Sequence, residues 1–158
     1  MDDPVSRYFP QFKHMHLAEI DGEGSLHDGP LVEKEITLRH ILSHTSGIGS
    51  GTIGALQIRN MPEASKRTLS NTISYFSEQG LSFLPYTKQE YSGFPAYDVL
   101  TGIIEKAADM AFAEFLSKEI FYPCDMIDTT FTPTQMQWER LAVMHDRVDG
   151  KNAIGKTF

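Results

Sequence analysis

The sequence lacks the features that mark several large functional classes. It has a single cysteine, Cys124, which excludes a framework of internal disulfide bonds and leaves the cellular compartment open. Its 14 Lys and Arg against 21 Asp and Glu give a net charge of −7, and no segment gathers the basic residues into a stripe. No apolar run approaches the length that crosses a bilayer, and residues 1–4 are nothing like the start of a signal peptide. We therefore predict neither nucleic acid nor a membrane as a partner, and the localisation stays unknown.

The usual signatures of a nucleophile are also missing. No Ser stands three residues before a Lys, and no Gly-x-Ser-x-Gly occurs anywhere in the chain. The first pattern places a serine next to a lysine base, and the second places it on a sharp turn where it is exposed to substrate. Cys124 has no neighbouring His in the sequence and is predicted to be a small residue of the core. The chain is therefore predicted to contain no nucleophile of its own.

Enough apolar material is present for one globular core, since 41% of the 158 residues are hydrophobic. The chain opens in mid-pattern between Pro4 and Pro10, without a capped helix or a strand before it. We therefore expect residues 1–158 to form a single partial domain. Gly, Asp, His and Glu dominate residues 13–34, which predicts a loop excursion with at most a small hairpin.

Helical spacing of apolar residues organises most of the remaining chain and predicts a mainly α fold. The predicted segments are a helix from its N-cap Thr37 to Gly47, a flexible crossing over residues 48–62, a helix over residues 63–79, a core helix pair within residues 91–131, and a tail over residues 132–158 with one amphipathic turn and a strand at 142–144.

Residues 150–157 match the P-loop pattern G-x-x-x-x-G-K-[ST] letter for letter. A P-loop binds phosphate because backbone N–H groups and the N-terminus of a following helix surround the anion. Only Phe158 follows the match here, so we expect a surface turn at Asp149. Binding of ATP or GTP that is lost on Lys156→Ala would favour the nucleotide alternative.

Two weaker patterns concern residues 40–54. Residues 49–54 fit G-x-G-x-x-G, but they follow a predicted helix instead of a strand, so we expect a pliable loop. His40 and His44 stand four residues apart, as zinc ligands do, yet Ile41 occupies the position where a metalloprotease needs Glu. We expect surface histidines of the helix, or histidines that support another residue. No metal site and no cofactor are predicted.

Four stretches of the chain together resemble one known family. They are residues 3–10, residues 36–47, the pair Tyr91-Ser92, and residues 120–131. In this order the stretches resemble the serine β-lactamase and penicillin-binding-protein-like hydrolases, in the class C branch that also contains carboxylesterases and acyltransferases. The resemblance implies the helical lobe of the α/β (α+β) serine β-lactamase-like transpeptidase fold, without most of its antiparallel sheet.

The resemblance also implies site residues. Members of the family use a Ser-x-x-Lys serine as nucleophile, a loop tyrosine that relays the proton, and a Lys-Thr-Gly or His-x-Gly strand on the other side of the substrate. Tyr91 corresponds to the proton relay, and Ser92 and Gly93 to substrate-binding positions. The serine would precede Met1, and residues 156–158 do not match the strand motif because Phe replaces its Gly. The resemblance thus implies a fragment of a serine hydrolase that is inactive by itself.

Several residues depart from the family pattern. Tyr86 follows Pro85 where a Gly is usual, and Asp109 stands where a Gly commonly closes the helix. Asp tolerates the left-handed backbone conformation that Gly would supply, so the fold should survive. Gly93 replaces a frequent Asn and removes an amide that would bind a substrate carbonyl. Together with the tail after Thr132, this change favours a carboxylesterase or acyltransferase.

The alternatives remain open at this stage. A β-lactamase or a D-Ala-D-Ala peptidase of the penicillin-binding-protein type would use the same catalytic residues on a β-lactam or a peptide. A non-catalytic binding module would associate with itself through the apolar helix faces that a missing sheet leaves exposed. The expected partner of the intact parent protein is a small-molecule ester or a β-lactam-like substrate.

Overall fold

The computed structural model describes residues 1–149 and 151–154, and the chain divides into two compact units, Met1–Phe112 and Ala113–Phe158. Each unit is described by itself. Within the described ranges, no helix combines the length and the apolar character needed to span a membrane.

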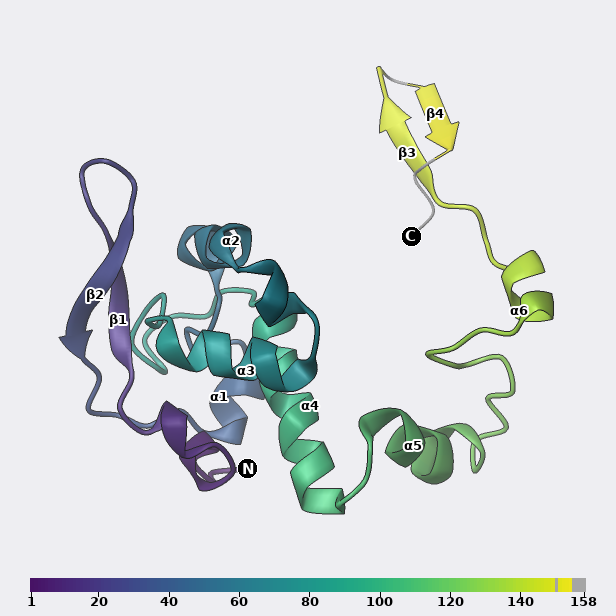
Figure 1. Ribbon diagram of the computed structural model, residues 1–158, viewed down its shortest axis with the longest axis horizontal. Helices are drawn as coiled ribbons and strands as arrows, with labels where there is room; N and C mark the ends of the chain where they lie inside the picture. The colour runs from purple at the N-terminus through teal and green to yellow at the C-terminus, as the bar shows by residue number, and fades with distance from the viewer. Residues whose placement is uncertain (150, 155–158) are drawn as a thin grey trace. The chain divides into compact units, whose positions relative to one another are not determined.

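The first unit begins with two short turns and a hairpin. The 3-10 turns η1 (Val5–Arg7) and η2 (Pro10–Phe12) precede the antiparallel strands β1 (His16–Ile20) and β2 (Leu26–Leu31) (Figure 1). The carboxylate of Asp21 accepts two backbone N–H bonds at the tip and so closes the turn. A hairpin thus occupies much of residues 13–34, where the sequence predicts a loop with at most a small hairpin.

Helices form the rest of the first unit. They are α1 (Leu38–Leu42), α2 (Gly51–Asn60), the 3-10 turn η3 (Glu63–Lys66), α3 (Leu69–Glu78) and α4 (Phe94–Ala108). Helix α3 packs against α4 and η2, α1 also contacts α4, and the hairpin contacts α2 (Figure 1). Apolar side chains of α1, α3 and α4 and of the segments between the elements make one core, against which Ile58 of α2 packs and in which Phe76 and Val99 are almost fully buried.

The helix predicted from Thr37 starts where expected but ends early. Thr37 caps α1 by accepting the backbone N–H of His40, whose side chain accepts the N–H of Thr37 in return. The helix stops at Leu42, because His44 adopts a left-handed conformation with φ 54°. The N–H of Thr45 then bonds to the carbonyl of His40, as in an ordinary helix ending. The predicted end at Gly47 is therefore wrong.

The flexible crossing predicted over residues 48–62 is also wrong, because α2 occupies most of it. Its glycines permit a close backbone approach instead of conferring flexibility. A Cβ atom on Gly54 would overlap the backbone of Gly49, which itself has φ 52°. This close local packing thus offsets the low helix propensity of glycine. The helix predicted over residues 63–79 is divided into η3 and α3, because Thr68 caps a new helix through the N–H of Asn71.

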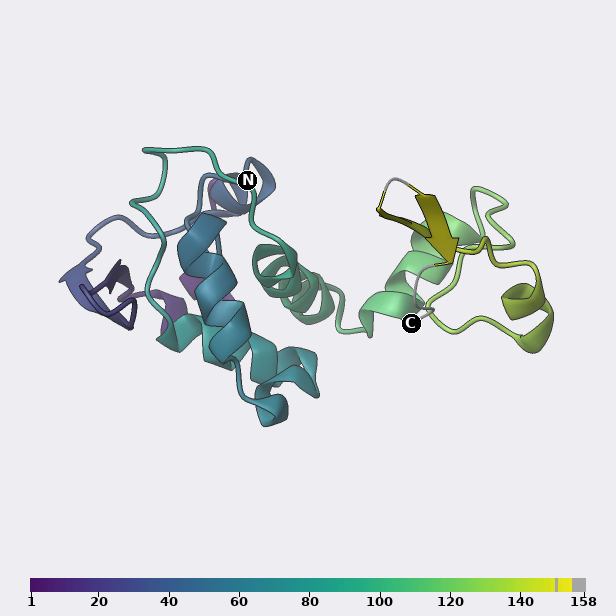
Figure 2. The same cartoon turned by 90° about the horizontal axis from the view of Figure 1, so that it is seen from above.

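The second unit contains short elements joined by irregular segments (Figure 2). These are α5 (Phe112–Leu116), which starts on the last residue of the first unit, the π-turn η4 (Ser117–Phe121), α6 (Gln135–Glu139), and the antiparallel strands β3 (His145–Val148) and β4 (Lys151–Ile154). Helix α6 confirms the predicted amphipathic turn, whereas the strand predicted at 142–144 begins three residues later, at His145.

No described side chain of the second unit is buried. Cys124 is exposed, so its predicted place in the core is wrong: the short helices of this unit have no second layer of structure that would cover them. The P-loop match lies partly outside the described residues, which omit 150 and 155–158. Its residues 151–154 form strand β4, and Asp149 lies in the turn before it.

Candidate active site around Tyr91

Tyr91 lies in the loop that leads into α4, and this loop is bound to the turn after α1. The backbone N–H of Tyr86 donates to the carbonyl of Thr45 over 2.9 Å, and the N–H of Glu90 donates to the carbonyl of His44 over 3.0 Å. The loop carrying Tyr91 is therefore held at two points by a segment more than forty residues earlier in the chain.

Ser92 connects this loop to α4. It is fully buried, and it forms an isolated antiparallel bridge with Ser50. Its hydroxyl oxygen accepts the backbone N–H of Ala96 over 3.3 Å, at the first turn of the helix. This contact agrees with a residue that starts a helix, whereas the substrate-binding role of Ser92 stays a prediction.

The phenol of Tyr91 faces outward beside a histidine. Its side chain is 72% exposed, and its ring centroid lies 4.9 Å from that of His44, with 44° between the planes. The ring centroid of Tyr97 in α4 also lies near that of His44, at 5.6 Å. In the part of the chain that the structure describes, the Tyr91 hydroxyl has no hydrogen-bond partner. It is therefore free to meet a reacting group.

The hydrogen bonds of His44 define its protonation pattern. Its Nδ1 atom lies 3.3 Å from the backbone N of Ser92, and its Nε2 atom lies 3.3 Å from the hydroxyl oxygen of Tyr97. A backbone amide can only donate, so Nδ1 must offer a lone pair. The neutral ring then carries its proton on Nε2 and donates it to Tyr97.

Gly93, the N-cap of α4, leaves open space at the position that would bind a substrate carbonyl. An added Cβ atom would meet nothing nearer than the Cδ of Pro95, at 4.0 Å. The backbone of Gly93, with φ −61° and ψ −122°, nevertheless lies outside the regions that residues with a Cβ atom usually adopt, so this conformation favours glycine. The candidate site therefore has open space here and no side-chain amide.

The charges near Tyr91 come from side chains that are already paired. Lys88 donates to the carboxylate of Glu90 over 2.9 Å, and its ammonium group also lies 5.8 Å from the ring centroid of Phe83. A proton-relay tyrosine needs a nearby cation that stabilises the phenolate. No free lysine of the described residues contacts Tyr91, and those residues contain no cluster of three or more His, Cys, Asp or Glu that could hold a metal ion.

His40 has a different role from His44. It is buried, and it caps α1 through the N–H of Thr37. Burial, followed by the charges of Lys34 and Arg39, lowers the pKa of His40. The prediction of a surface histidine is wrong for His40. The alternative prediction, a histidine that supports another residue, fits the hydrogen bonds of both: His40 accepts the N–H of Thr37, and His44 accepts the N–H of Ser92. They do not share a helix face, since α1 ends before His44.

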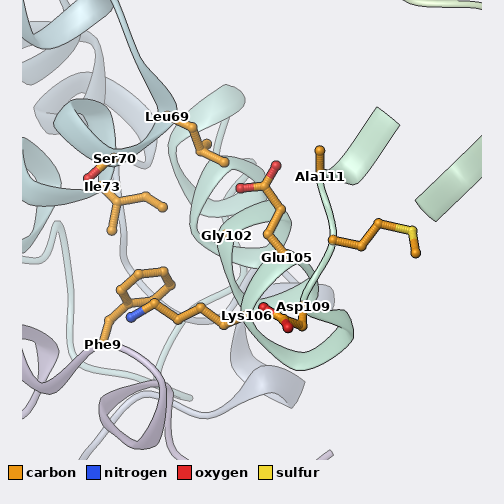
Figure 3. A pocket seen from close by; sticks show the side chains of 10 residues that line it. Phe9, Leu69, Ser70, Ile73, Gly102, Glu105, Lys106, Asp109 and Ala111 are labelled. Carbon is orange, nitrogen blue, oxygen red and sulfur yellow. The ribbon is translucent and has the colours of Figure 1, made fainter. Parts of the chain in front are cut away.

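A cavity of about 530 Å³ lies at the opposite end of α4 from Tyr91 (Figure 3). Phe9, Gly102 and Lys106 are among the residues that line it. The ammonium of Lys106 donates to the carbonyl of Tyr8 over 2.7 Å and sits 4.0 Å from the ring centroid of Phe9. The ammonium group of Lys106 is therefore already bound by other residues of the fold. A binding pocket usually presents convergent free polar groups, so we place the candidate site at Tyr91 and not in this cavity.

Comparison with known proteins identifies the family. The family model described as Beta-lactamase matches residues 1–154. The chain belongs to this family. The resemblance seen in the sequence is therefore confirmed.

Individual relatives agree. The chain is 29% identical over 154 residues to Esterase EstB of Burkholderia gladioli, which covers 92% of this chain and 35% of the esterase. It is 32% identical over 110 residues to Penicillin-binding protein 4* of Bacillus subtilis (strain 168), which covers 67% of this chain and 23% of that protein. The chain thus spans about a third or less of these two relatives.

The solved structure of EstCE1, described as a hydrolase with promiscuous acyltransferase activity, superposes on 98% of this Beta-lactamase-family chain with a TM-score of 0.73 and 23% identity. It covers 38% of the EstCE1 chain. At this identity the likeness shows a shared fold, that of the serine β-lactamases and penicillin-binding proteins.

The sequence alone missed the contact between His44 and Tyr97. Residues 36–47 include His44 and form part of the family resemblance, but the sequence predicts that His44 lies within a helix that ends at Gly47. Tyr97 follows Tyr91 by six residues and lies within the predicted core helix pair, where no pattern marks it. Their pairing depends on the left-handed turn at His44, which no spacing pattern indicates.

Proposed function

We propose that this chain supplies the tyrosine side of the active site of a serine hydrolase that works through an acyl-enzyme, with carboxylic esters as substrates or acyl donors. The chain would form the helical lobe of the fold, without most of the antiparallel sheet. The observation that supports this best is the outward-facing phenol of Tyr91, fixed before α4 in a chain of the Beta-lactamase family.

The proposed chemistry follows from a phenol beside a serine. The serine hydroxyl attacks the ester carbonyl, and its proton passes to the deprotonated oxygen of Tyr91. A bond forms between serine oxygen and carbonyl carbon, the ester C–O bond breaks, and Tyr91 returns the proton to the departing alkoxide. Water or an acceptor alcohol then releases the acyl group. The serine, and the lysine that favours the phenolate, would come from sequence outside this chain.

The preference for esters is supported by Gly93. The space beside Gly93 is open, but its backbone conformation favours glycine, so the site is built without a side-chain amide at this position. An ester site manages without a carbonyl-binding amide more readily than a β-lactam site does. The relatives EstB and EstCE1 are described as an esterase and as a hydrolase with acyltransferase activity, which agrees with this preference.

The relay role can be tested in a chimera. Residues 1–154 would replace the matched segment of EstB, and hydrolysis of p-nitrophenyl esters would be measured with and without Tyr91→Phe. We expect kcat to fall by about 10²–10⁴-fold, the range for a lost proton-transfer group. Tyr122→Phe, at a tyrosine that is 81% exposed in the second unit, is the matched control. Full activity of the Tyr91→Phe chimera would refute the relay.

The isolated chain should be inactive, because it contains no Ser-x-x-Lys. Incubation with p-nitrophenyl esters, nitrocefin and a fluorophosphonate probe should give no turnover and no stoichiometric label. Specific labelling of one serine would overturn this proposal.

A β-lactamase or D-Ala-D-Ala peptidase is the second candidate, favoured by the 32% identity to Penicillin-binding protein 4*. The two candidates differ in their dependence on the amide at position 93. In the chimera, Gly93→Asn should raise nitrocefin hydrolysis relative to ester hydrolysis if the site is built for esters. Efficient nitrocefin turnover by the chimera with its own Gly93 would favour the second candidate instead.

A non-catalytic, self-associating module is the remaining candidate. It is favoured by the second unit, where Ile127 is 82% and Met136 is 74% exposed. Apolar area of this kind commonly marks an interaction surface. Light scattering over a range of concentrations should show an increasing mass if the module self-associates. A strictly monomeric and cooperatively folding chain would exclude this candidate.

A further inference from the structure

His44 is the one described side chain whose ring contacts the ring of Tyr91. Its own position is determined by its backbone: the N–H of His44 donates to the carbonyl of Ile41 over 3.1 Å, and its carbonyl accepts the N–H of Glu90. The side chain is partly buried, while the phenol beside it is exposed. The imidazole is thus the inner surface against which an outward-facing tyrosine rests.

Two hydrogen bonds hold the plane of the imidazole. Nδ1 accepts from the backbone of Ser92, and Nε2–H donates to the oxygen of Tyr97. Bonds at the two nitrogens, each 3.3 Å long, restrict rotation of the ring about its χ2 angle, because any large turn breaks both. The ring can therefore present a constant face to Tyr91, at the observed 44° between the planes.

We propose that His44 is the positioning residue of Tyr91: its imidazole, held in the Nε2–H tautomer by Ser92 and Tyr97, orients the phenol for proton transfer. The use of this orientation in proton transfer rests on the proposed function. The orientation of the Tyr91 ring by His44 does not. An exposed tyrosine otherwise samples several rotamers. A relay needs its oxygen in one place, since a misplacement of about 1 Å can lower a rate by about a hundredfold.

The fold does not depend on the imidazole for this loop. The backbone bond from Tyr86 to Thr45 and the bridge between Ser50 and Ser92 hold the loop without any side chain of residue 44. A replacement at His44 is therefore expected to leave the first unit folded and to affect the Tyr91 ring specifically. This separates a positioning role from a general contribution to stability.

The test uses NMR spectroscopy of the chain. Long-range ¹H–¹⁵N spectra report which imidazole nitrogen of His44 carries the proton, and relaxation of ¹³C in the aromatic rings reports the order of each tyrosine. In the wild-type chain we expect a proton on Nε2 and none on Nδ1, and a Tyr91 ring clearly more ordered than that of Tyr122, which is 81% exposed. A protonated Nδ1, or equal disorder of the two rings, would overturn the proposal.

Two variants divide the contributions. In His44→Asn, the amide oxygen can still accept the Ser92 N–H, and Asn tolerates the positive φ of 54°, but the ring is lost. We expect the circular dichroism spectrum and the protection of the Ser92 amide to persist while the order of the Tyr91 ring falls to that of Tyr122. Unchanged order of Tyr91 in this variant would refute the proposal. Tyr97→Phe removes the acceptor for Nε2–H and should give an intermediate order.

The chimera with EstB separates this inference from the proposed function. There, His44→Asn should lower kcat by about 10–100-fold with little change in KM, because substrate binding is retained while the relay is misplaced. If Tyr91→Phe keeps full activity while the NMR results hold, the relay fails and the positioning of Tyr91 stands. If Tyr91→Phe abolishes activity while His44→Asn changes neither kcat nor ring order, the relay stands and His44 has no positioning role.

Discussion

The two units of this chain differ in what they do with their apolar residues. In the first, fifteen apolar side chains are buried in one core, and Phe76 retains only 2% of its exposure. In the second, Phe131 is 58% exposed, and no described side chain is buried. Both units contain amphipathic helices, but among the residues that the structure describes the extensive contacts between helices lie in the first unit. Amphipathic spacing therefore indicates which face of a helix can be buried. Whether that face is buried depends on a second layer of structure that packs against it.

The candidate site lies in the unit that has the core. His44 and Tyr97 belong to segments whose backbones are fixed by buried neighbours, such as Ile41 and Val99. A relay tyrosine needs that support, because its oxygen must be held within a fraction of an ångström. The second unit would need a partner surface before it could position a reacting group.

The largest expected effect comes from truncating the same residue type in both units. Phe76→Ala should lower the free energy of unfolding by about 3–5 kcal/mol, because it opens a cavity in the core. Phe131→Ala should change it by less than about 0.5 kcal/mol. Urea titration followed by circular dichroism measures both, and the fluorescence of Trp138, the one tryptophan of the chain, reports on the second unit alone. Equal losses in the two variants would contradict the contrast between the units.

A glycine substitution tests how tightly the turn before the site is packed. Gly47 has φ 79°, and a Cβ atom there would overlap the carbonyl oxygen of Phe83. Gly47→Ala should destabilise the first unit by about 1–3 kcal/mol or more, the range for a strained backbone. Gly22→Ala, where no atom lies within 4 Å, is the matched control and should stay within about 0.5 kcal/mol. Thermal unfolding measures the midpoint temperature of each variant. Equal midpoints for Gly47→Ala and Gly22→Ala would contradict the tight packing at Gly47.

Each unit contains an aspartate in the left-handed backbone conformation, so the same substitution can be compared in the two units. Asp109 closes α4 with φ 50°, and Asp125 in the second unit has φ 55°. Asp109→Gly should stabilise the chain by up to about 1 kcal/mol, since Gly adopts this conformation without strain. Asp125→Gly should leave the main unfolding transition unchanged, because its surroundings contribute no buried core. A stabilisation by Asp125→Gly in urea titrations would show that the second unit unfolds together with the first.

A pH dependence is the smallest expected effect. The pKa of buried His40 is lowered below its usual 6.5, so the unfolded chain binds a proton more readily than the folded one. The contribution of His40 to the free energy of unfolding should be complete above about pH 6.5 and should fall as the pH drops below that value toward the lowered pKa.

His40→Gln keeps an acceptor for the N–H of Thr37, as in a capping box, and should flatten the dependence of the unfolding free energy on pH. His145→Gln, at an exposed histidine of β3, should not. Urea titrations between about pH 7 and 5 measure the slope, and an unchanged slope in His40→Gln would assign the titration to another group.

Much of the fold follows from local chemistry, and these parts were predicted. Thr37 is a helix cap because its hydroxyl accepts a free N–H, and Asp109 ends α4 in the left-handed conformation as expected. Helix α2 was not predicted, because glycine is a poor helix former in isolation. The contact between Gly54 and Gly49, which favours glycine there, exists only after the chain has folded.

The site was only partly predictable for the same reason. The resemblance to a family names Tyr91 as a candidate, and the sequence predicts His44 as a surface histidine of the helix or one that supports another residue. The Ser92 N–H and the His44 ring that accepts it are 48 residues apart in the sequence. Neither residue carries a local pattern that indicates the other.

The sequence by itself determined the family and the caps of the helices, and it named Tyr91 as the candidate relay, because motifs and short-range hydrogen bonds depend on neighbours in the chain. The tertiary structure alone decided the place of His44 in contact with two tyrosine rings, because this place needs contacts between segments far apart in the sequence. The end of α1 and the helix in the glycine-rich segment depend on the left-handed turn at His44 and on the contact between Gly54 and Gly49, which no sequence motif predicts. The exposure of Cys124 was decided in the same way, since an apolar stretch is buried only where another layer covers it.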